Sequence, residues 1–220
     1  MAKKESIEKV QETLDEDSVW RKRELGTLKA ILQSEATRDH EQLLFCRASI
    51  TLAYAHWEGF TKNGIRTVLK YVSDLEIKLA DINDGLLAHS LHKKIQSSSK
   101  ENSSAALTQL VRTIRKGSSE NFLFNRKNFN KQSLDEKVFR NLMTEIGIEC
   151  DTILSAMPGV TDISIGARLV KRRNEIAHGE RLDLEKIECI KILETVQVLI
   201  DVIKDNLIKY LESGAYSNTS

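Results

Sequence analysis

Proline is almost absent from the sequence: Pro158 is the single occurrence in 220 residues, and glycine occurs only ten times. Aromatic residues are also scarce, at 5% of the chain, whereas leucine, isoleucine, glutamate, lysine and alanine recur throughout. Because proline and glycine interrupt helices and straight-chain residues favour them, this composition predicts long helices with few breaks. A length of 220 residues suits one substantial domain.

Cysteine is scarce too, and the three residues Cys46, Cys150 and Cys189 are far apart in the chain. Two of them lie in largely apolar runs, LLFCRASI and KIECIKIL. An odd number of scattered cysteines in apolar surroundings indicates buried free thiols in a reducing compartment. We therefore expect no disulfide.

Long apolar runs are missing. The first ten residues, MAKKESIEKV, hold no apolar stretch long enough for a signal peptide, and no later segment approaches a membrane span. We therefore expect a cytoplasmic protein without a membrane partner.

Neither sign of charge dominates, since 33 lysines and arginines face 32 acidic residues for a net charge of +1. A near-neutral total neither favours nor excludes nucleic acid, because a partner responds to the local distribution of charge. His40, His89 and His92 show no metal-ligand spacing with any cluster of cysteine, aspartate or glutamate. We therefore expect neither a metal site nor a cofactor.

Apolar residues recur at helical spacing over most of the chain. The most apolar stretch, residues 41–72, predicts a long central helix packed on several sides. Ser133 and Glu136 form a capping-box pattern at the start of a further helix, and Gly147 suits its end. Asp183 suits the N-cap of the last helix.

Leu182 and Ile187 flank that cap at the spacing of a hydrophobic staple. The helical pattern extends over residues 18–211, whereas apolar positions are sparse in residues 1–17 and residues 212–220 are mostly polar. The sequence therefore predicts an all-α bundle of four to five main helices in one domain at 18–211, with a frayed start and a flexible tail.

Residues 73–131 differ from the rest, because they are rich in serine and asparagine and have weak periodicity. Between residues 93 and 131, nine lysines and arginines stand against two acidic residues. We interpret the segment as a basic, partly irregular insertion with a short strand at residues 122–124.

This insertion is a candidate RNA-binding segment. Arg126 and Lys127 are interleaved there with Phe122, Phe124 and Phe129, and basic residues among aromatics suit phosphate contacts and base stacking. A solvated loop anchored to the bundle by its phenylalanines explains the same pattern, so both interpretations stay open.

Arg173 occupies an unusual position for a charged residue. It lies four residues after Leu169 and three before Ile176, on the apolar face of a predicted helix. A guanidinium placed there requires a carboxylate, a phosphate or solvent. Arg173 therefore either pairs with a buried acid or faces a cleft or an interface. His178 follows five positions later and directly precedes Gly179, which suits the helix end.

The same helix, opened by Asp162 or Ser164, carries further cations beside Arg173. Lys171 and Arg172 are well placed to bind phosphate, although an exposed helix face explains them equally well.

Two separated stretches resemble a known family. Arg173-Asn174-Glu175-Ile176-Ala177-His178 resembles the R-N-x-x-x-H motif of the HEPN superfamily. AYAHWEGFTK, residues 53–62, and LIKYL, residues 207–211, are similar to segments of a prokaryotic HEPN nuclease family, the MAE type. The resemblance extends over roughly residues 20–211 and is weakest in the serine-rich middle.

The resemblance implies a metal-independent ribonuclease that acts at a site shared between the two chains of a homodimer. It assigns Arg173 to stabilising charge on the phosphate and His178 to proton transfer. Asn174 would orient the histidine or bind the phosphate. Such proteins serve as toxins or antiviral-defence effectors, so an antitoxin or regulatory partner is expected.

Glu58 completes the candidate catalytic set of Arg173, Asn174, His178 and Glu58, because a polar residue of an earlier helix approaches the motif in HEPN proteins. A structural ion pair between Glu58 and Arg173 is the competing interpretation. For the whole protein, the alternative to an RNA-cleaving enzyme is a non-catalytic HEPN module that binds RNA, a nucleotide or a partner protein. Trp57 is expected in the core.

Overall fold

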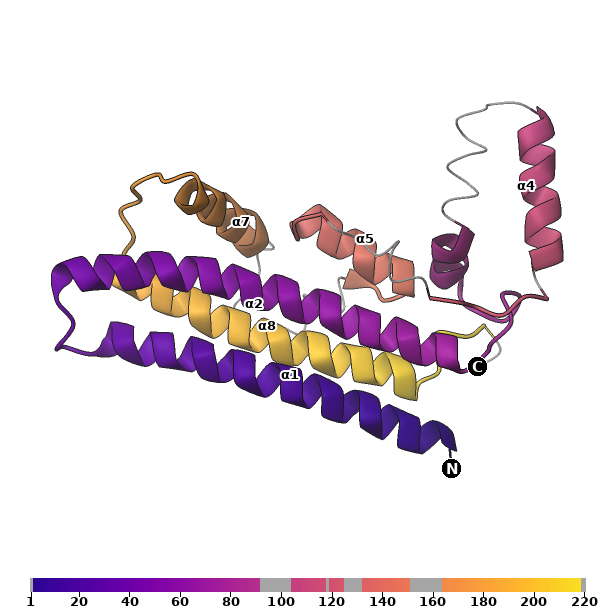
Figure 1. Cartoon of the computed structure of the whole chain (residues 1–220), viewed down its shortest axis with the longest axis horizontal. Coiled ribbons are helices and arrows are strands. Elements are labelled where there is room, and N and C mark those ends of the chain that lie inside the picture. Colours follow the sequence, from indigo (N-terminus) through magenta and orange to yellow (C-terminus); the bar gives the residue numbers. More distant parts are fainter. Residues whose placement is uncertain (1, 92–103, 118, 125–131, 151–163, 219–220) are drawn as a thin grey trace.

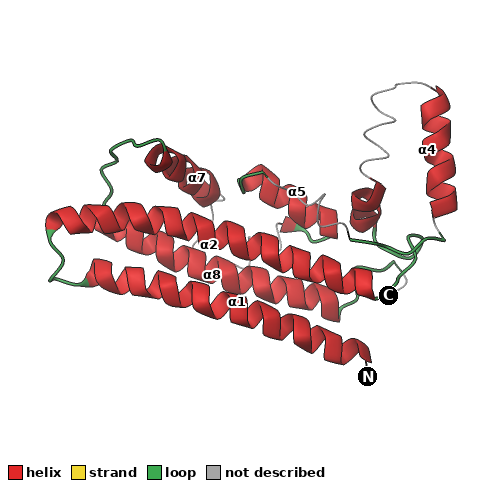
Figure 2. Cartoon of the chain, in the orientation of Figure 1, coloured by secondary structure: helices red, strands yellow, loops and turns green. Residues whose placement is uncertain are grey.

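A computed structural model describes residues 2–91, 104–117, 119–124, 132–150 and 164–218. Within these ranges the structure is all-helical, with six main helices and no strand (Figures 1 and 2). In chain order the helices are α1 (Ala2–Gln33), α2 (Asp39–Asp74), α4 (Ser104–Gly117), α5 (Glu136–Ile146), α7 (Ser164–Ala177) and α8 (Lys186–Glu212). The predicted all-α bundle is confirmed, and α4 is the main helix that the sequence pattern did not predict.

Three long helices, α1, α2 and α8, pack lengthwise against one another and enclose the core (Figure 1). The predicted central helix is α2, which also contacts α5 and α7 and is therefore apolar on several faces. Its backbone comes close to α8 at Gly64, where a Cβ atom would lie 2.7 Å from Cδ1 of Leu207. A larger residue at position 64 would force the Leu207 side chain to shift.

The shorter helices α5 and α7 lie along one side of α2, whereas α4 extends away from the bundle (Figure 1). Helix α5 begins after Asp135, whose side chain accepts a hydrogen bond of 2.7 Å from the Val138 amide. The predicted capping box of Ser133 and Glu136 is therefore wrong, because Asp135 takes the N-cap position. The predicted end of the helix is confirmed, with Gly147 at a positive φ of 81°.

The last helix also begins later than predicted. Helix α8 starts at Lys186, and its N-cap residue Glu185 makes no capping hydrogen bond with its side chain. Asp183 is thus not the N-cap, and the predicted staple is wrong because Ile187 is largely exposed.

Both ends of the described chain contact the bundle. Helix α1 includes residues 2–17, and Val10 and Leu14 are buried in the core. Beyond α8, Tyr216 is buried, and the Asn218 amide donates a 2.8 Å hydrogen bond to the Asp81 carbonyl. The frayed start and the flexible tail stay predictions, whereas the described residues Val10, Leu14 and Tyr216 pack on the bundle.

Within its described residues, the predicted insertion contains helix α4 and a helical segment at residues 84–91. The predicted strand at residues 122–124 is wrong: the described part of the segment contains an isolated bridge between Lys78 and Asn121. Phe122 is fully buried, and its amide donates a 2.7 Å hydrogen bond to the Ile77 carbonyl. Phe122 thus anchors this segment to the bundle.

Cys46, Cys150 and Cys189 are all buried and free, as predicted, whereas the reducing compartment stays a prediction. Burial raises the pKa of the Cys189 thiol, and the nearby Cys46 thiol raises it further. Of the helices in the described ranges, none has the length and apolar character needed to cross a membrane.

Candidate active site

Helix α7 carries the motif from Arg173 to Ala177 and packs against α2 and α5. Leu169 is buried, which fixes the face of α7 that packs on the bundle. The helix ends in a Schellman motif: the Glu180 amide donates to the Glu175 carbonyl at 2.9 Å, and the Gly179 amide donates to the Ile176 carbonyl at 3.1 Å. Gly179 adopts a positive φ of 84°. The predicted helix end is therefore confirmed.

Arg173 is half-buried and lies against an aromatic ring. Its Cζ atom is 4.5 Å from the centroid of the Tyr54 ring on α2. Its Nη1 atom donates a 2.8 Å hydrogen bond to Oδ1 of the neighbouring Asn174. The ring and the amide are thus two contacts that help to orient the guanidinium.

Tyr54 is in turn fixed from the other side. Its hydroxyl accepts a 2.9 Å hydrogen bond from the Leu134 amide, directly before α5. Burial raises the pKa of Tyr54, and the negative charge of Glu58 raises it further. The tyrosine is therefore a neutral phenol at physiological pH and supports Arg173 with its ring.

Glu58 lies close to this arrangement without pairing with Arg173. Its Oε1 atom is 2.7 Å from Nζ of Lys62, and it accepts a second hydrogen bond, at 3.1 Å, from the same Leu134 amide that Tyr54 binds. Among the described residues there is no ion pair between Glu58 and Arg173. The structural ion-pair interpretation is therefore wrong, and Tyr54 and Lys62 are the site residues that sequence reasoning missed.

His178 is exposed at the end of α7, and its amide donates a 2.9 Å hydrogen bond to the Asn174 carbonyl. The loop that follows is tied to α2, because Nη1 of Arg47 donates a 2.7 Å hydrogen bond to the Glu180 carbonyl. The imidazole is thus carried on an ordered turn and is open to solvent.

The predicted phosphate-binding cations differ in their surroundings. Lys171 is exposed, with Nζ 3.8 Å from Glu175. Arg172 forms an ion pair with Glu188 of α8, with its Nη1 atom 2.6 Å from Oε1 of the glutamate. Arg126 and Lys127 lie outside the described residues.

The AYAHWEG stretch is divided between two faces of α2. Tyr54 and Glu58 face α5 and α7, whereas His56 faces α1, with Nε2 2.6 Å from Oε2 of Glu24. Gly59 lies beside Arg21 of α1, where a Cβ atom would be 2.6 Å from Nη1. The histidine and glycine of this stretch therefore hold α1 against α2.

Burial lowers the pKa of His56, and the carboxylate of Glu24 opposes this effect. An unfolded histidine has a pKa near 6.5, so the unfolded state binds this proton more readily than the folded state. The folding stability that depends on a neutral His56 is fully present above pH ~6.5. It should be lost as the pH falls toward the pKa of His56 in the folded state, which is lower than in the unfolded state. Urea unfolding of the wild type and His56→Asn between pH 7.5 and 5.5 tests this. We expect a shallower loss of stability in the variant; equal slopes would contradict the assignment.

Trp57 is buried in the core, as predicted. It lies in edge contact with Tyr54, with ring centroids 6.2 Å apart. The core thus supports the ring on which Arg173 lies.

The chain is an all-helical bundle, and the Arg-Asn-x-x-x-His motif lies at the end of α7, the helix before α8. This is the arrangement of a HEPN domain. The family model described as HEPN_MAE_28990-like HEPN matches residues 10–216. The chain therefore belongs to this HEPN family, and the resemblance inferred from the motifs is confirmed. Comparison with curated proteins and with solved structures gives no match.

Proposed function

We propose that this protein is a metal-independent endoribonuclease. The observation that carries the proposal is the end of α7, where Arg173 is held on the Tyr54 ring and His178 is exposed on an ordered turn. HEPN domains are often ribonucleases, which supports the same conclusion.

The proposed reaction is attack of a ribose 2′-oxygen on the adjacent phosphorus. The 2′-hydroxyl loses its proton to a base, the new O–P bond forms, and the bond to the 5′-oxygen breaks as that oxygen receives a proton. The products carry a 2′,3′-cyclic phosphate and a 5′-hydroxyl. Histidine side chains exchange protons near neutral pH, so His178 is assigned to proton transfer.

Arg173 is assigned to the charge that develops on the non-bridging oxygens. A guanidinium binds phosphate oxygens with paired, charge-assisted hydrogen bonds, and one held in place before the reaction needs little reorganisation. Asn174 accepts a hydrogen bond from Nη1 of Arg173, so we assign it to orienting the guanidinium. Glu58 helps to fix the Leu134 amide and Lys62 next to the site.

We propose that the site is completed by a second copy of the chain. Arg173 and His178 are five positions apart in the sequence, and at about 100° per residue this places them about 140° apart around the axis of α7. They therefore diverge within one chain, and a homodimer that brings two α7 ends together supplies both groups to one phosphate.

The biological role proposed is that of a toxin or an antiviral-defence effector, regulated by an antitoxin or another partner protein. The HEPN family membership supports this role.

Incubation of single-stranded RNA with the protein in EDTA, followed by analysis of the product ends, tests the proposal. We expect cyclic phosphate and 5′-hydroxyl ends, and no cleavage of DNA of the same sequence, because DNA lacks the 2′-hydroxyl nucleophile. RNA that carries one 2′-deoxyribose should resist cleavage at that position alone. Tight RNA binding without cleavage would instead support the non-catalytic HEPN module.

A further inference from the structure

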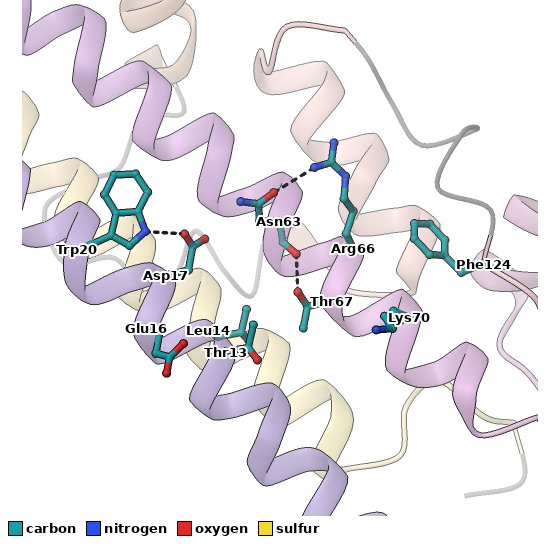
Figure 3. Close-up of a pocket in the computed structure, with 10 residues that line it drawn as sticks. All are labelled: Thr13, Leu14, Glu16, Asp17, Trp20, Asn63, Arg66, Thr67, Lys70 and Phe124. Atoms are coloured by element: carbon teal, nitrogen blue, oxygen red, sulfur yellow. Dashed lines mark hydrogen bonds between the residues drawn. The ribbon is translucent and has the colours of Figure 1, made fainter.

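A groove of about 690 Å³ lies between α1 and α2, on a face that the candidate active site does not use (Figure 3). Its walls combine an aromatic ring, cations and small polar groups. The residues that matter here are Glu16, Asp17 and Trp20 of α1 and Asn63, Arg66 and Lys70 of α2.

Trp20 forms a fixed aromatic surface at one end of the groove. Its Nε1 atom donates a 2.9 Å hydrogen bond to Oδ1 of Asp17, and its ring lies edge-on to His56 at 5.2 Å. The guanidinium of Arg21 lies 4.5 Å from the ring centroid. Even so, Trp20 is 48% exposed. A large aromatic residue that is both immobilised and open suits stacking with a flat, unpaired ring.

The cations of the groove continue a row that begins beside the candidate active site. Lys62, Arg66 and Lys70 follow one another at intervals of four residues on α2. Each interval advances about 6 Å along the helix and turns about 40° around it. Lys62 pairs with Glu58 next to Tyr54, whereas Arg66 and Lys70 line the groove. The row thus connects the site near Arg173 to the groove.

We propose that this groove binds a segment of single-stranded RNA that adjoins the scissile phosphate. Phosphates contact Arg66 and Lys70, and one base stacks on Trp20. Stacking on an aromatic side chain requires an unpaired base, so the groove selects single-stranded over double-stranded RNA. This inference rests on the proposed ribonuclease activity for its purpose, although the binding itself is testable without cleavage.

Two acidic residues also line the groove and affect the expected binding. Oδ1 of Asp17 already accepts hydrogen bonds from Trp20 and from Nε of Arg21, at 2.9 and 3.0 Å. Glu16 is exposed on α1 and repels a phosphate backbone. Neutralising Glu16 should therefore strengthen RNA binding, an effect opposite in sign to loss of a cation.

The test is binding of a 2′-O-methyl oligoribonucleotide of eight residues, which no 2′-hydroxyl attack can cleave. Trp57 is buried, so quenching of tryptophan fluorescence by the oligonucleotide reports on Trp20. We expect quenching in the wild type. The anisotropy of a labelled oligonucleotide gives the affinity of every variant, and Trp20→Ala should bind about tenfold more weakly, as for one lost base stack. Lys70→Gln should weaken binding and lower the salt dependence by about 0.7, the value for one phosphate contact on a single strand. Glu16→Gln should bind more tightly.

Lys191→Gln is the matched control, because it removes one exposed lysine from α8, outside the groove, and should bind as the wild type does. Wild-type affinity in both Trp20→Ala and Lys70→Gln would overturn the inference, as would the absence of any binding by the wild type. If the protein cleaves no RNA but the groove variants bind the oligonucleotide more weakly than the wild type, RNA binding in the groove is supported and the proposed ribonuclease activity is rejected. The two proposals therefore fail in different experiments.

Discussion

Replacement of His178 by alanine should lower kcat for RNA cleavage by about 10²–10⁴-fold, the contribution typical of a positioned general acid or base. The fold should remain intact, because the side chain is exposed and the hydrogen bond at this position comes from the backbone amide. Single-turnover cleavage and thermal unfolding of the same preparations measure both quantities. His40→Ala, another exposed histidine, is the control and should retain wild-type kcat.

A heterodimer with one Arg173→Ala chain and one His178→Ala chain extends this test to the proposed shared site. Purified through two different tags, it should cleave at up to half the wild-type rate although each variant homodimer is nearly inactive, because one of its two composite sites takes Arg173 from one chain and His178 from the other. No recovery of activity in the heterodimer would show that each chain uses its own pair of groups and would reject the composite arrangement.

The bundle was predictable because long helices with apolar stripes leave little choice of fold. The features that the sequence could not show lie where distant partners decide the outcome. The apolar positions Val10 and Leu14 are too sparse to predict a stable helix alone, yet α2 and α8 supply the surface that buries them. Likewise, Tyr216 is buried by packing against Tyr71 and Tyr210, which its local sequence does not reveal.

The candidate site shows the same division between local and distant information. Helical spacing correctly placed Arg173 against the bundle, but spacing does not tell which residue of α2 lies opposite. Tyr54 and Glu58 are four residues apart and share one face. The Glu58 carboxylate forms an ion pair with Lys62, four residues later, and the ring of Tyr54 contacts the guanidinium of Arg173. The ion pair between Glu58 and Lys62 has a spacing that the sequence does contain.

Replacement of Arg173 by alanine should lower kcat by about 10²–10³-fold, the loss typical when one preorganised donor to a developing charge is removed. The cost in stability should be only about 1 kcal/mol, since the described contacts of the side chain are a ring and a neighbouring amide. Loss of a buried ion pair would instead cost ~3–5 kcal/mol. Cleavage kinetics and urea unfolding of one preparation therefore separate a role in the reaction from a role in the fold.

Substitutions at Tyr54 test how the guanidinium is held. Tyr54→Phe retains the ring below Arg173 and should keep most of kcat, because Glu58 still accepts the Leu134 amide. Tyr54→Leu removes the stack and should lower kcat with a smaller change in KM, since the guanidinium is then free to adopt unproductive orientations. Arg140→Ala, which truncates a half-buried arginine on α5, is the control and should leave kcat unchanged. Equal activity of Tyr54→Leu and Tyr54→Phe would show that the ring does not position Arg173, because both variants lack the hydroxyl and differ only in the aromatic face.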